Sequence, residues 1–234
     1  MKQNDQNKLL ERLKNIQDQV AESCLKSNRT LNDVNIMAVT KTVPPEFVNL
    51  AIDNGINLIG ENKVQEFLSK YEDYHIKKQG IHFIGHLQTN KVKYIIDKVN
   101  MIESVSSFKL ANEINKRAKE NNLFMNILLE VNIGQEPSKQ GLIPTEVMNI
   151  AEQITQLTNV KLCGVMCIPP KDNTEFYFDK MNTLFNHLKD AHLENSCIRY
   201  LSMGMSSDYQ MAIKHNSNIV RIGSALFGER NIGG

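Results

Sequence analysis

Paired cysteines are missing from this sequence. The 234 residues include four cysteines, Cys24, Cys163, Cys167 and Cys197, and no two of them form a Cys-x-x-Cys pair. Secreted domains held by disulfides and structural zinc sites both need closely spaced Cys or His residues. The scattered cysteines therefore predict reduced thiols in a cytoplasmic protein and no metal site.

Long apolar runs and an excess of one charge are also missing. No apolar stretch approaches the roughly 20 residues of a membrane-spanning helix, and the polar N-terminus lacks the apolar segment of a signal peptide. The formal net charge is only +1, and the Lys and Arg residues are scattered along the chain. These features argue against nucleic acid or a membrane as a partner.

A regular alternation of helical and strand-like segments is what the sequence does contain. An N-terminal helix is predicted within residues 1–30, because apolar residues recur there at helical spacing. Strand-like apolar stretches follow at 34–42, 56–62, 81–87, 101–105, 124–133, 160–168, 198–203 and 219–227. Helical patterns separate these stretches, including one that starts at Thr89 or Asn90.

This alternation predicts an α/β fold with a parallel sheet. The count and the chain length predict a (β/α)8 TIM barrel over residues 34–228 with an extra N-terminal helix, in a single domain of residues 1–234. An open doubly wound sheet is the alternative, but it normally has a Gly-rich turn where TKTVP stands at 40–44. Only residues 229–234 follow the eighth strand, so the N-terminal helix is a candidate to replace a closing helix.

A lysine stands at the end of the first predicted strand. Active sites of such barrels lie at the C-terminal ends of the strands, and Lys41 is followed there by Pro44 and Pro45. Two interpretations remain open. Lys41 either marks the point where the strand reaches water, or it is a desolvated amine with a lowered pKa, of the kind that forms Schiff bases.

The loops after strands seven and eight are the frequent phosphate position of this architecture. The segment SMGMSS at 202–207 leads from a strand into a helix N-terminus, which favours an anion. Gly223 and Ser224 would add backbone donors and a hydroxyl. Ser206 and Ser207 alone could simply cap the helix, and Asp208 would have to face away from a bound phosphate.

An arginine is predicted on the inner face of the eighth strand. Arg221 shares a strand face with Gly223 by alternation, and if this face is interior, the guanidinium needs an acceptor because it cannot lose its proton. An ion pair with Glu61 or Glu130 is an equal alternative to a contact with a ligand. Together, the lysine, the phosphate loops and the arginine suit pyridoxal 5′-phosphate, which needs an amine, phosphate donors and a partner for its ring nitrogen.

Five sequence blocks carry a family resemblance. They are AVTKT at 38–42, IGENKVQE at 59–66, HFIGHLQTNK at 82–91, SMGMSSD at 202–208 and VRIGSALFG at 220–228. In this order they closely resemble the YggS/PROSC family of pyridoxal phosphate homeostasis proteins. These proteins are similar to the barrel half of alanine racemase, a fold type III pyridoxal phosphate protein.

The resemblance implies a role for each matching residue. Lys41 would hold the cofactor as a Schiff base, Arg221 would face the pyridine nitrogen, and Asn62 would lie beside the lysine and the ring. His86 would lie at the rim of the site without an assigned role. The other cofactor-binding residues that it implies are Ser202, Met203, Gly204, Gly223 and Ser224, with Ser202, Gly223 and Ser224 at the phosphate.

The same resemblance bears on catalysis. An arginine at the ring nitrogen keeps that nitrogen unprotonated and weakens the cofactor as an electron sink. Racemisation in the alanine racemase relatives uses a second base, a tyrosine from a separate domain, and the chain ends at Gly234 without that domain. Tyr209 is the nearest tyrosine in sequence to the phosphate loops and is a weak candidate for this base.

Three hypotheses for the function follow. The favoured one is a monomeric protein of pyridoxal phosphate homeostasis that holds the cofactor on Lys41 without substrate turnover, with cofactor-requiring apo-enzymes as recipients. The second is a pyridoxal phosphate-dependent amino-acid racemase of the alanine racemase type. The third is a barrel isomerase without the cofactor, which acts on a sugar phosphate through a Schiff base on Lys41.

Overall fold

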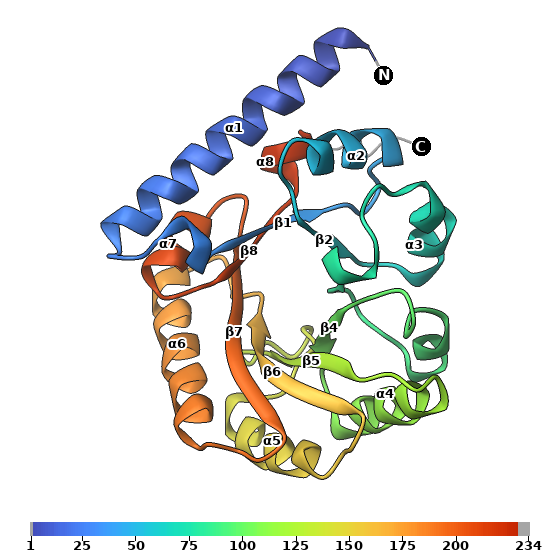
Figure 1. The fold of residues 1–234 in the computed structure, drawn as a ribbon. Coiled ribbons are helices and arrows are strands. Elements are labelled where there is room, and N and C mark those ends of the chain that lie inside the picture. The colour runs from blue at the N-terminus through green and yellow to red at the C-terminus, as the bar shows by residue number, and fades with distance from the viewer. Residues whose placement is uncertain (1, 229–234) are drawn as a thin grey trace.

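Eight parallel strands close into a barrel that is surrounded by helices (Figure 1), in a computed structural model that describes residues 2–228. The strand order follows the chain, and β8 pairs with β1 to close the sheet. The strands are β1 Asn35–Val39, β2 Leu58–Glu61, β3 Ile81–Phe83, β4 Met101–Val105, β5 Met125–Val131, β6 Val160–Cys167, β7 Ser196–Met205 and β8 Ile219–Ile222. The predicted (β/α)8 barrel is confirmed.

Helices and short 3₁₀ turns connect the strands on the outside of the barrel. The α-helices are α1 Gln3–Lys26, α2 Pro45–Asp53, α3 Val64–Lys70, α4 Phe108–Glu120, α5 Val147–Thr155, α6 Thr174–Asp190, α7 Tyr209–Lys214 and α8 Ser224–Phe227. The 3₁₀ turns are η1 Leu31–Asp33, η2 Tyr71–Asp73, η3 Lys78–Gly80, η4 Thr89–Tyr94 and η5 Pro144–Glu146. No helix within residues 2–228 is both long and apolar enough to cross a membrane.

The N-terminal helix covers the side of the barrel where the last helix is short. α8 has four residues, and α1 packs against α2, α7 and α8 (Figure 1). The buried stripe of α1 consists of Leu9, Leu13, Ile16, Val20 and Cys24. Burial of each large aliphatic side chain stabilises the fold by about 1.5–3 kcal/mol. α1 therefore takes the place of a closing helix, while residues 229–234 lie outside the described residues.

The barrel interior holds two small apolar groups together with buried polar and charged side chains, among them Arg221 and the paired His82 and Glu103. The groups are Met37, Val39, Leu58, Ile84 and Ile219, and Met101, Leu128, Cys163 and Met166. Arg221 pairs with Met37 across the β1–β8 ladder, so both side chains point to the same face of the sheet. This register places the guanidinium of Arg221 inside the barrel.

Two predicted strands extended too far at the C-terminal end of the barrel. β1 ends at Val39, before Lys41, and Thr42 has a positive φ of +62°. β3 ends at Phe83, before His86. Lys41 and His86 therefore lie in loops, where a rigid scaffold of this kind carries its functional residues.

The predicted end of strand eight was also wrong. β8 ends at Ile222, and the segment SALF at 224–227 forms α8 instead of continuing the strand. A short apolar run fits a strand or a buried helix equally well by its pattern alone. The helix predicted after Thr89 is likewise a 3₁₀ helix of six residues, η4, a form that is frequent in short connections.

Gly204 provides a test of the packing of α7 on β7. Its φ is +94°, and a Cβ atom at this position would lie 2.5 Å from the Cβ atom of Ala212. Gly204→Ala should lower the free energy of unfolding by about 2–4 kcal/mol, because it adds a left-handed backbone penalty to an overpacked contact. Urea denaturation measures this loss.

Gly55→Ala is the matched control for this substitution. Gly55 also has a positive φ, +105°, but the nearest atom to its added Cβ would be 3.4 Å away. The control should cost about 1 kcal/mol, from the backbone alone. Equal losses in the two variants would contradict the packing role of Gly204.

Candidate functional site

A cavity of about 290 Å³ lies at the C-terminal end of the barrel. Five of the predicted site residues line it together, namely Lys41, Asn62, Arg221, Gly223 and Ser224. The remaining lining residues are Val39, Ile84, Ile168, Met205, Ser206 and Ser207. Apolar walls with a few converging polar groups are typical of cofactor and ligand sites. Residues from both ends of the chain meet here because β8 closes the barrel against β1.

Arg221 is held by two uncharged acceptors. Its side chain is buried, with 4% of the residue exposed. Nη1 donates to Ser202 Oγ at 2.8 Å, and Nη2 donates to the carbonyl oxygen of Cys167 at 2.7 Å. These bonds fix the plane of the guanidinium without neutralising it. Its positive charge therefore remains available to a group in the cavity.

Neither carboxylate that was considered as a partner forms an ion pair with Arg221 within residues 2–228. Glu61 accepts hydrogen bonds from Thr40 and Tyr74 instead, on the helix-facing side of the barrel wall. Burial raises the pKa of Glu130, and the charge of Arg221 acts in the opposite direction. The prediction of an ion pair to Glu61 or Glu130 is therefore wrong for the described residues.

Three of the predicted cofactor-binding residues lie behind the cavity wall. Ser202 is fully buried and accepts the hydrogen bond from Arg221. Met203 is also fully buried, in the apolar layer between strands and helices. Gly204 brings its backbone against Ala212 of α7. In the described part of the chain these three residues support the cavity but do not line it.

Ser206, which the sequence placed in the SMGMSS segment with a helix cap as the alternative, lines the cavity. Its Oγ accepts hydrogen bonds from the backbone N–H groups of Gly223 at 3.2 Å and Ala225 at 3.1 Å. It does not cap α7, because that helix begins at Tyr209 with Asp208 at its N-cap position. Two backbone donors therefore converge on one oxygen at the edge of the cavity. Their pairing with Ser206 depends on the distant β8 loop, which no local pattern specifies.

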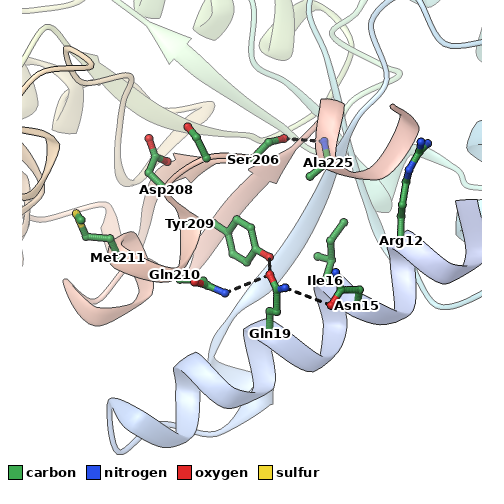
Figure 2. A pocket seen from close by; sticks show the side chains of 11 residues that line it. Arg12, Asn15, Ile16, Gln19, Ser206, Asp208, Tyr209, Gln210, Met211 and Ala225 are labelled. Carbon is green, nitrogen blue, oxygen red and sulfur yellow. Dashed lines mark hydrogen bonds between the residues drawn. The ribbon is translucent and has the colours of Figure 1, made fainter. Parts of the chain in front are cut away.

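Asp208 and Tyr209 belong to a second cavity, of about 350 Å³, between α1 and α7 (Figure 2). Asp208 Oδ1 accepts from the N–H of Met205 at 2.6 Å. The Tyr209 hydroxyl donates to Gln19 Oε1, which also accepts from Gln210 Nε2 at 3.1 Å. Asp208 thus faces away from the Lys41 cavity, as a phosphate would require, and the Tyr209 hydroxyl is bound to α1.

His86 lies in a neighbouring hollow of about 430 Å³, which also contains Lys63 and Lys91. Asn62 lines both this hollow and the Lys41 cavity. Its Oδ1 is buried and has no hydrogen-bond partner among residues 2–228. Asn62 is close to the next loop, since a Cβ atom on Gly85 would lie 2.0 Å from its carbonyl oxygen. Asn62 therefore lies between the two hollows with a buried, unsatisfied side-chain oxygen.

No group of three or more His, Cys, Asp or Glu side chains within residues 2–228 could hold a metal ion. The cysteines in this part of the chain are free thiols. Burial raises the pKa of the Cys163 thiol to about 11 and that of Cys167 to about 12. Both thiols are therefore protonated and weakly reactive at neutral pH.

Known proteins resemble this chain over nearly its full length. The profile of the family described as alanine racemase, N-terminal domain, matches residues 13–231. A pyridoxal phosphate homeostasis protein of Aquifex aeolicus (strain VF5) is 42% identical over 224 residues, which cover 94% of this chain and 97% of that protein.

Two solved structures share the fold and part of the sequence. The crystal structure of an unknown protein from Bifidobacterium adolescentis has a TM-score of 0.90 and 30% identity, and the match covers 97% of each chain. The structure of PipY from Synechococcus elongatus PCC7942 with PLP bound has a TM-score of 0.81 and 28% identity. That match covers 94% of this chain and 100% of PipY.

The half-buried carboxyl of Glu130 leads to a prediction about the pH dependence of stability. Because burial raises its pKa on folding, the folded protein favours the protonated form, and stability is lost as pH rises through the raised pKa. Glu130→Gln removes this loss. The free energy of unfolding of the variant minus that of the wild type should therefore increase as pH rises from about 4 to about 7. Urea denaturation at several pH values measures this difference.

Glu175→Gln is the control with the opposite sign. Hydrogen bonds from Lys214 and His215 lower the pKa of the exposed Glu175 carboxyl. The stability from this carboxylate is present at neutral pH and is lost as pH falls, so the control should lose stability relative to the wild type toward pH 7. A constant difference between Glu130→Gln and the wild type at all pH values would contradict the prediction.

Proposed function

This chain belongs to the family of pyridoxal phosphate homeostasis proteins, and on this premise we propose that it binds pyridoxal 5′-phosphate in the Lys41 cavity. One observation carries the proposal. Lys41, Arg221, Asn62 and the loop of Gly223 lie around a single cavity of about 290 Å³. The PLP-bound structure of PipY supports the same assignment.

The groups around the cavity fit the chemistry of this cofactor. A primary amine matches an aldehyde, and a guanidinium held by neutral acceptors matches a basic ring nitrogen. The unsatisfied Oδ1 of Asn62 can accept from a polar substituent of the ring. The N–H groups that converge on Ser206 mark the place where backbone donors can meet a phosphate.

When bound, the cofactor supplies an electrophilic aldehyde carbon. Lys41 Nζ would hold this carbon through a C=N bond in place of the C=O bond, with the aldehyde oxygen lost as water and no oxidant or reductant needed. Such an attachment would be covalent and reversible, since water can reverse the same condensation.

Arg221 makes the site better suited to holding the cofactor than to demanding catalysis. A guanidinium donates a hydrogen bond but does not give up its proton. The ring nitrogen therefore stays unprotonated and withdraws little electron density from a bound substrate. We propose that the chain holds and releases pyridoxal phosphate without substrate turnover, which is a role in homeostasis of the cofactor.

The cellular part of the proposal follows the same reasoning. Free thiols are typical of a reducing compartment, so we propose that the protein lies in the cytoplasm. We propose separately that it is a monomer. The recipients of released cofactor would be apo-enzymes that require it. A racemase of the alanine racemase type is the alternative, and it needs a second base. The Tyr209 hydroxyl is bound to Gln19 in the second cavity, which disfavours it for that role.

Lys41→Ala tests covalent binding. The wild type with pyridoxal phosphate should show the visible absorption band of a C=N bond, which borohydride removes while fixing the cofactor mass on the peptide that contains Lys41. Lys41→Ala should show neither change. Lys63→Ala is the control, because Lys63 lines the neighbouring hollow and not this cavity. A band that persists in Lys41→Ala would sink the proposal.

Exchange of α-protons tests the absence of turnover. In deuterated water, the cofactor-loaded wild type should exchange the α-protons of a panel of amino acids no faster than Lys41→Ala does. The physical reason is that an arginine-bound ring nitrogen stays unprotonated and is a weak electron sink, which disfavours removal of the α-proton. NMR measures the exchange, and a fast, Lys41-dependent exchange would favour the racemase alternative.

A further inference from the structure

Lys41, which would carry the cofactor, lies in a turn beyond the end of β1, outside the hydrogen-bonded strand. The last ladder contact before it is the bond from Thr40 N–H to the carbonyl oxygen of Gly60, at 3.1 Å. Thr42 follows with φ of +62°, in the left-handed region that a β-branched residue rarely adopts. A hydrogen bond from the Val43 N–H to the carbonyl oxygen of Thr40, at 3.0 Å, closes this turn, and side chains of another element add further contacts to it.

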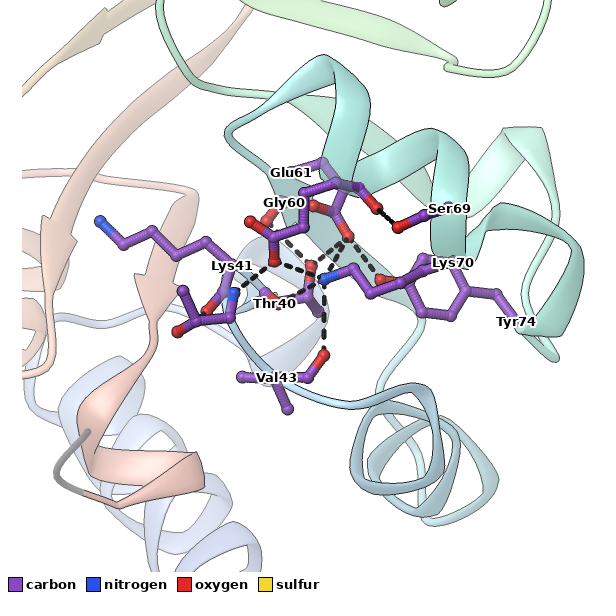
Figure 3. A network of polar contacts seen from close by, with 10 residues as sticks. Thr40, Lys41, Val43, Gly60, Glu61, Ser69, Lys70 and Tyr74 are labelled. Carbon is purple, nitrogen blue, oxygen red and sulfur yellow. Dashed lines mark hydrogen bonds and ion pairs between the residues drawn. The ribbon is translucent and has the colours of Figure 1, made fainter. Parts of the chain in front are cut away.

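Two side chains of α3 supply those contacts (Figure 3). Lys70 Nζ donates to the carbonyl oxygen of Thr40 at 3.0 Å and to that of Val43 at 3.4 Å. Glu66 Oε1 accepts from the backbone N–H of Thr42. The same Oε1 pairs with Lys70 Nζ at 2.8 Å. The Glu66–Lys70 pair thus binds backbone groups on both sides of Lys41.

A second carboxyl group, that of Glu61, lies next to this pair. Glu61, fully buried, accepts from Thr40 Oγ1 at 2.7 Å and from the Tyr74 hydroxyl at 2.5 Å. Lys70 Nζ lies 3.7 Å from the same Glu61 oxygen. Burial raises the pKa of Glu61, while the charge of Lys70 and the hydrogen bonds from Tyr74 and Thr40 act in the opposite direction. Glu66, at 2.8 Å, is the nearer carboxylate to Lys70 Nζ.

The loss of hydration of an ion pair in this position offsets much of its attraction, so the pair contributes little to the stability of the fold. The side chain of Lys70 is 10% exposed and that of Glu66 is 23% exposed, so both charges lose most of their hydration. Such pairs often contribute little net stability compared with apolar side chains, and they are best explained where they fix a geometry. Here the geometry that they fix is the turn of residues 40–43.

We propose that Glu66 and Lys70 are positioning residues that present Lys41 to the cavity. This inference rests on the proposed attachment of the cofactor to Lys41. Figure 3 shows the Lys41 side chain leaving the turn on the side away from Lys70. With the turn fixed, the direction of the Cα–Cβ bond of Lys41 is set before the cofactor arrives, so less conformational freedom is lost when Nζ forms its bond.

Stopped-flow absorbance tests the inference through the rate at which the visible band appears after pyridoxal phosphate is added. Glu66→Ala and Lys70→Met should each slow this rate by about tenfold. This is the factor that corresponds to the loss of one hydrogen bond of ordinary strength to a charged group. Glu66→Gln keeps an acceptor for the N–H of Thr42 and should recover most of the rate. Thermal unfolding of each variant reports the folded fraction.

A surface pair provides the matched control. Lys214 and Glu175 form an ion pair at 2.8 Å, far from the turn in sequence and with both side chains more than half exposed. Lys214→Met and Glu175→Gln remove the same charges and should leave the rate of band formation unchanged. A slower rate in these controls would assign the effect to overall charge and overturn the inference.

The remaining outcomes separate the inference from the proposed function. A wild type that develops no band would refute attachment to Lys41, and the inference with it. A normal wild-type band with unchanged rates in Glu66→Ala and Lys70→Met, even at a lowered melting temperature, would show a merely structural role and overturn the inference alone. If Lys70→Met does not fold, the pair Glu66→Ala and Glu66→Gln decides, because Glu66 is the more exposed partner.

Discussion

A permanent positive charge inside a closed barrel is the constraint on which the rest of this site depends. Arg221 cannot lose its proton, so the interior must supply acceptors for its N–H groups. The structure supplies them from β6 and β7, through the carbonyl oxygen of Cys167 and the hydroxyl of Ser202. Because both acceptors are neutral, the guanidinium keeps its charge at the wall of the cavity. The chemistry proposed for the cavity follows from this arrangement.

On the other wall of the cavity, contacts to the backbone around Lys41 fix its position, whereas Arg221 is fixed through its own side chain. Lys41 lies in a turn after β1, and the backbone on both sides of it is bound by Glu66 and Lys70 from α3. The barrel therefore provides a rigid frame, while a partly buried ion pair outside its wall contacts the turn that carries Lys41. Arg221 and Lys41 approach the same cavity because β1 and β8 are neighbours in the closed sheet.

A protein that only binds the cofactor and an enzyme that uses it would differ in the residues around Lys41. Binding requires an amine, a phosphate site and a ring partner, and side chains or N–H groups with these properties line the Lys41 cavity. Racemisation by two bases requires in addition a base on the opposite face of the substrate. The tyrosine that is nearest in sequence, Tyr209, is bound to α1 in a separate cavity. The proposed homeostasis role follows from this difference.

The sequence by itself determined the barrel and three of the residues that line its cavity. Strands of a parallel barrel are buried on both faces, so they read as short apolar runs between helical patterns. Lys41, Asn62 and Arg221 stand at the ends of such runs, in blocks with a specific family resemblance. Tertiary structure alone decided which way the remaining residues face. Ser202 supports Arg221 instead of lining the cavity, and the Ser206 hydroxyl accepts from two backbone N–H groups that follow β8. Each of these outcomes depends on contacts between segments that are distant in the chain, and no local pattern of residues specifies such contacts.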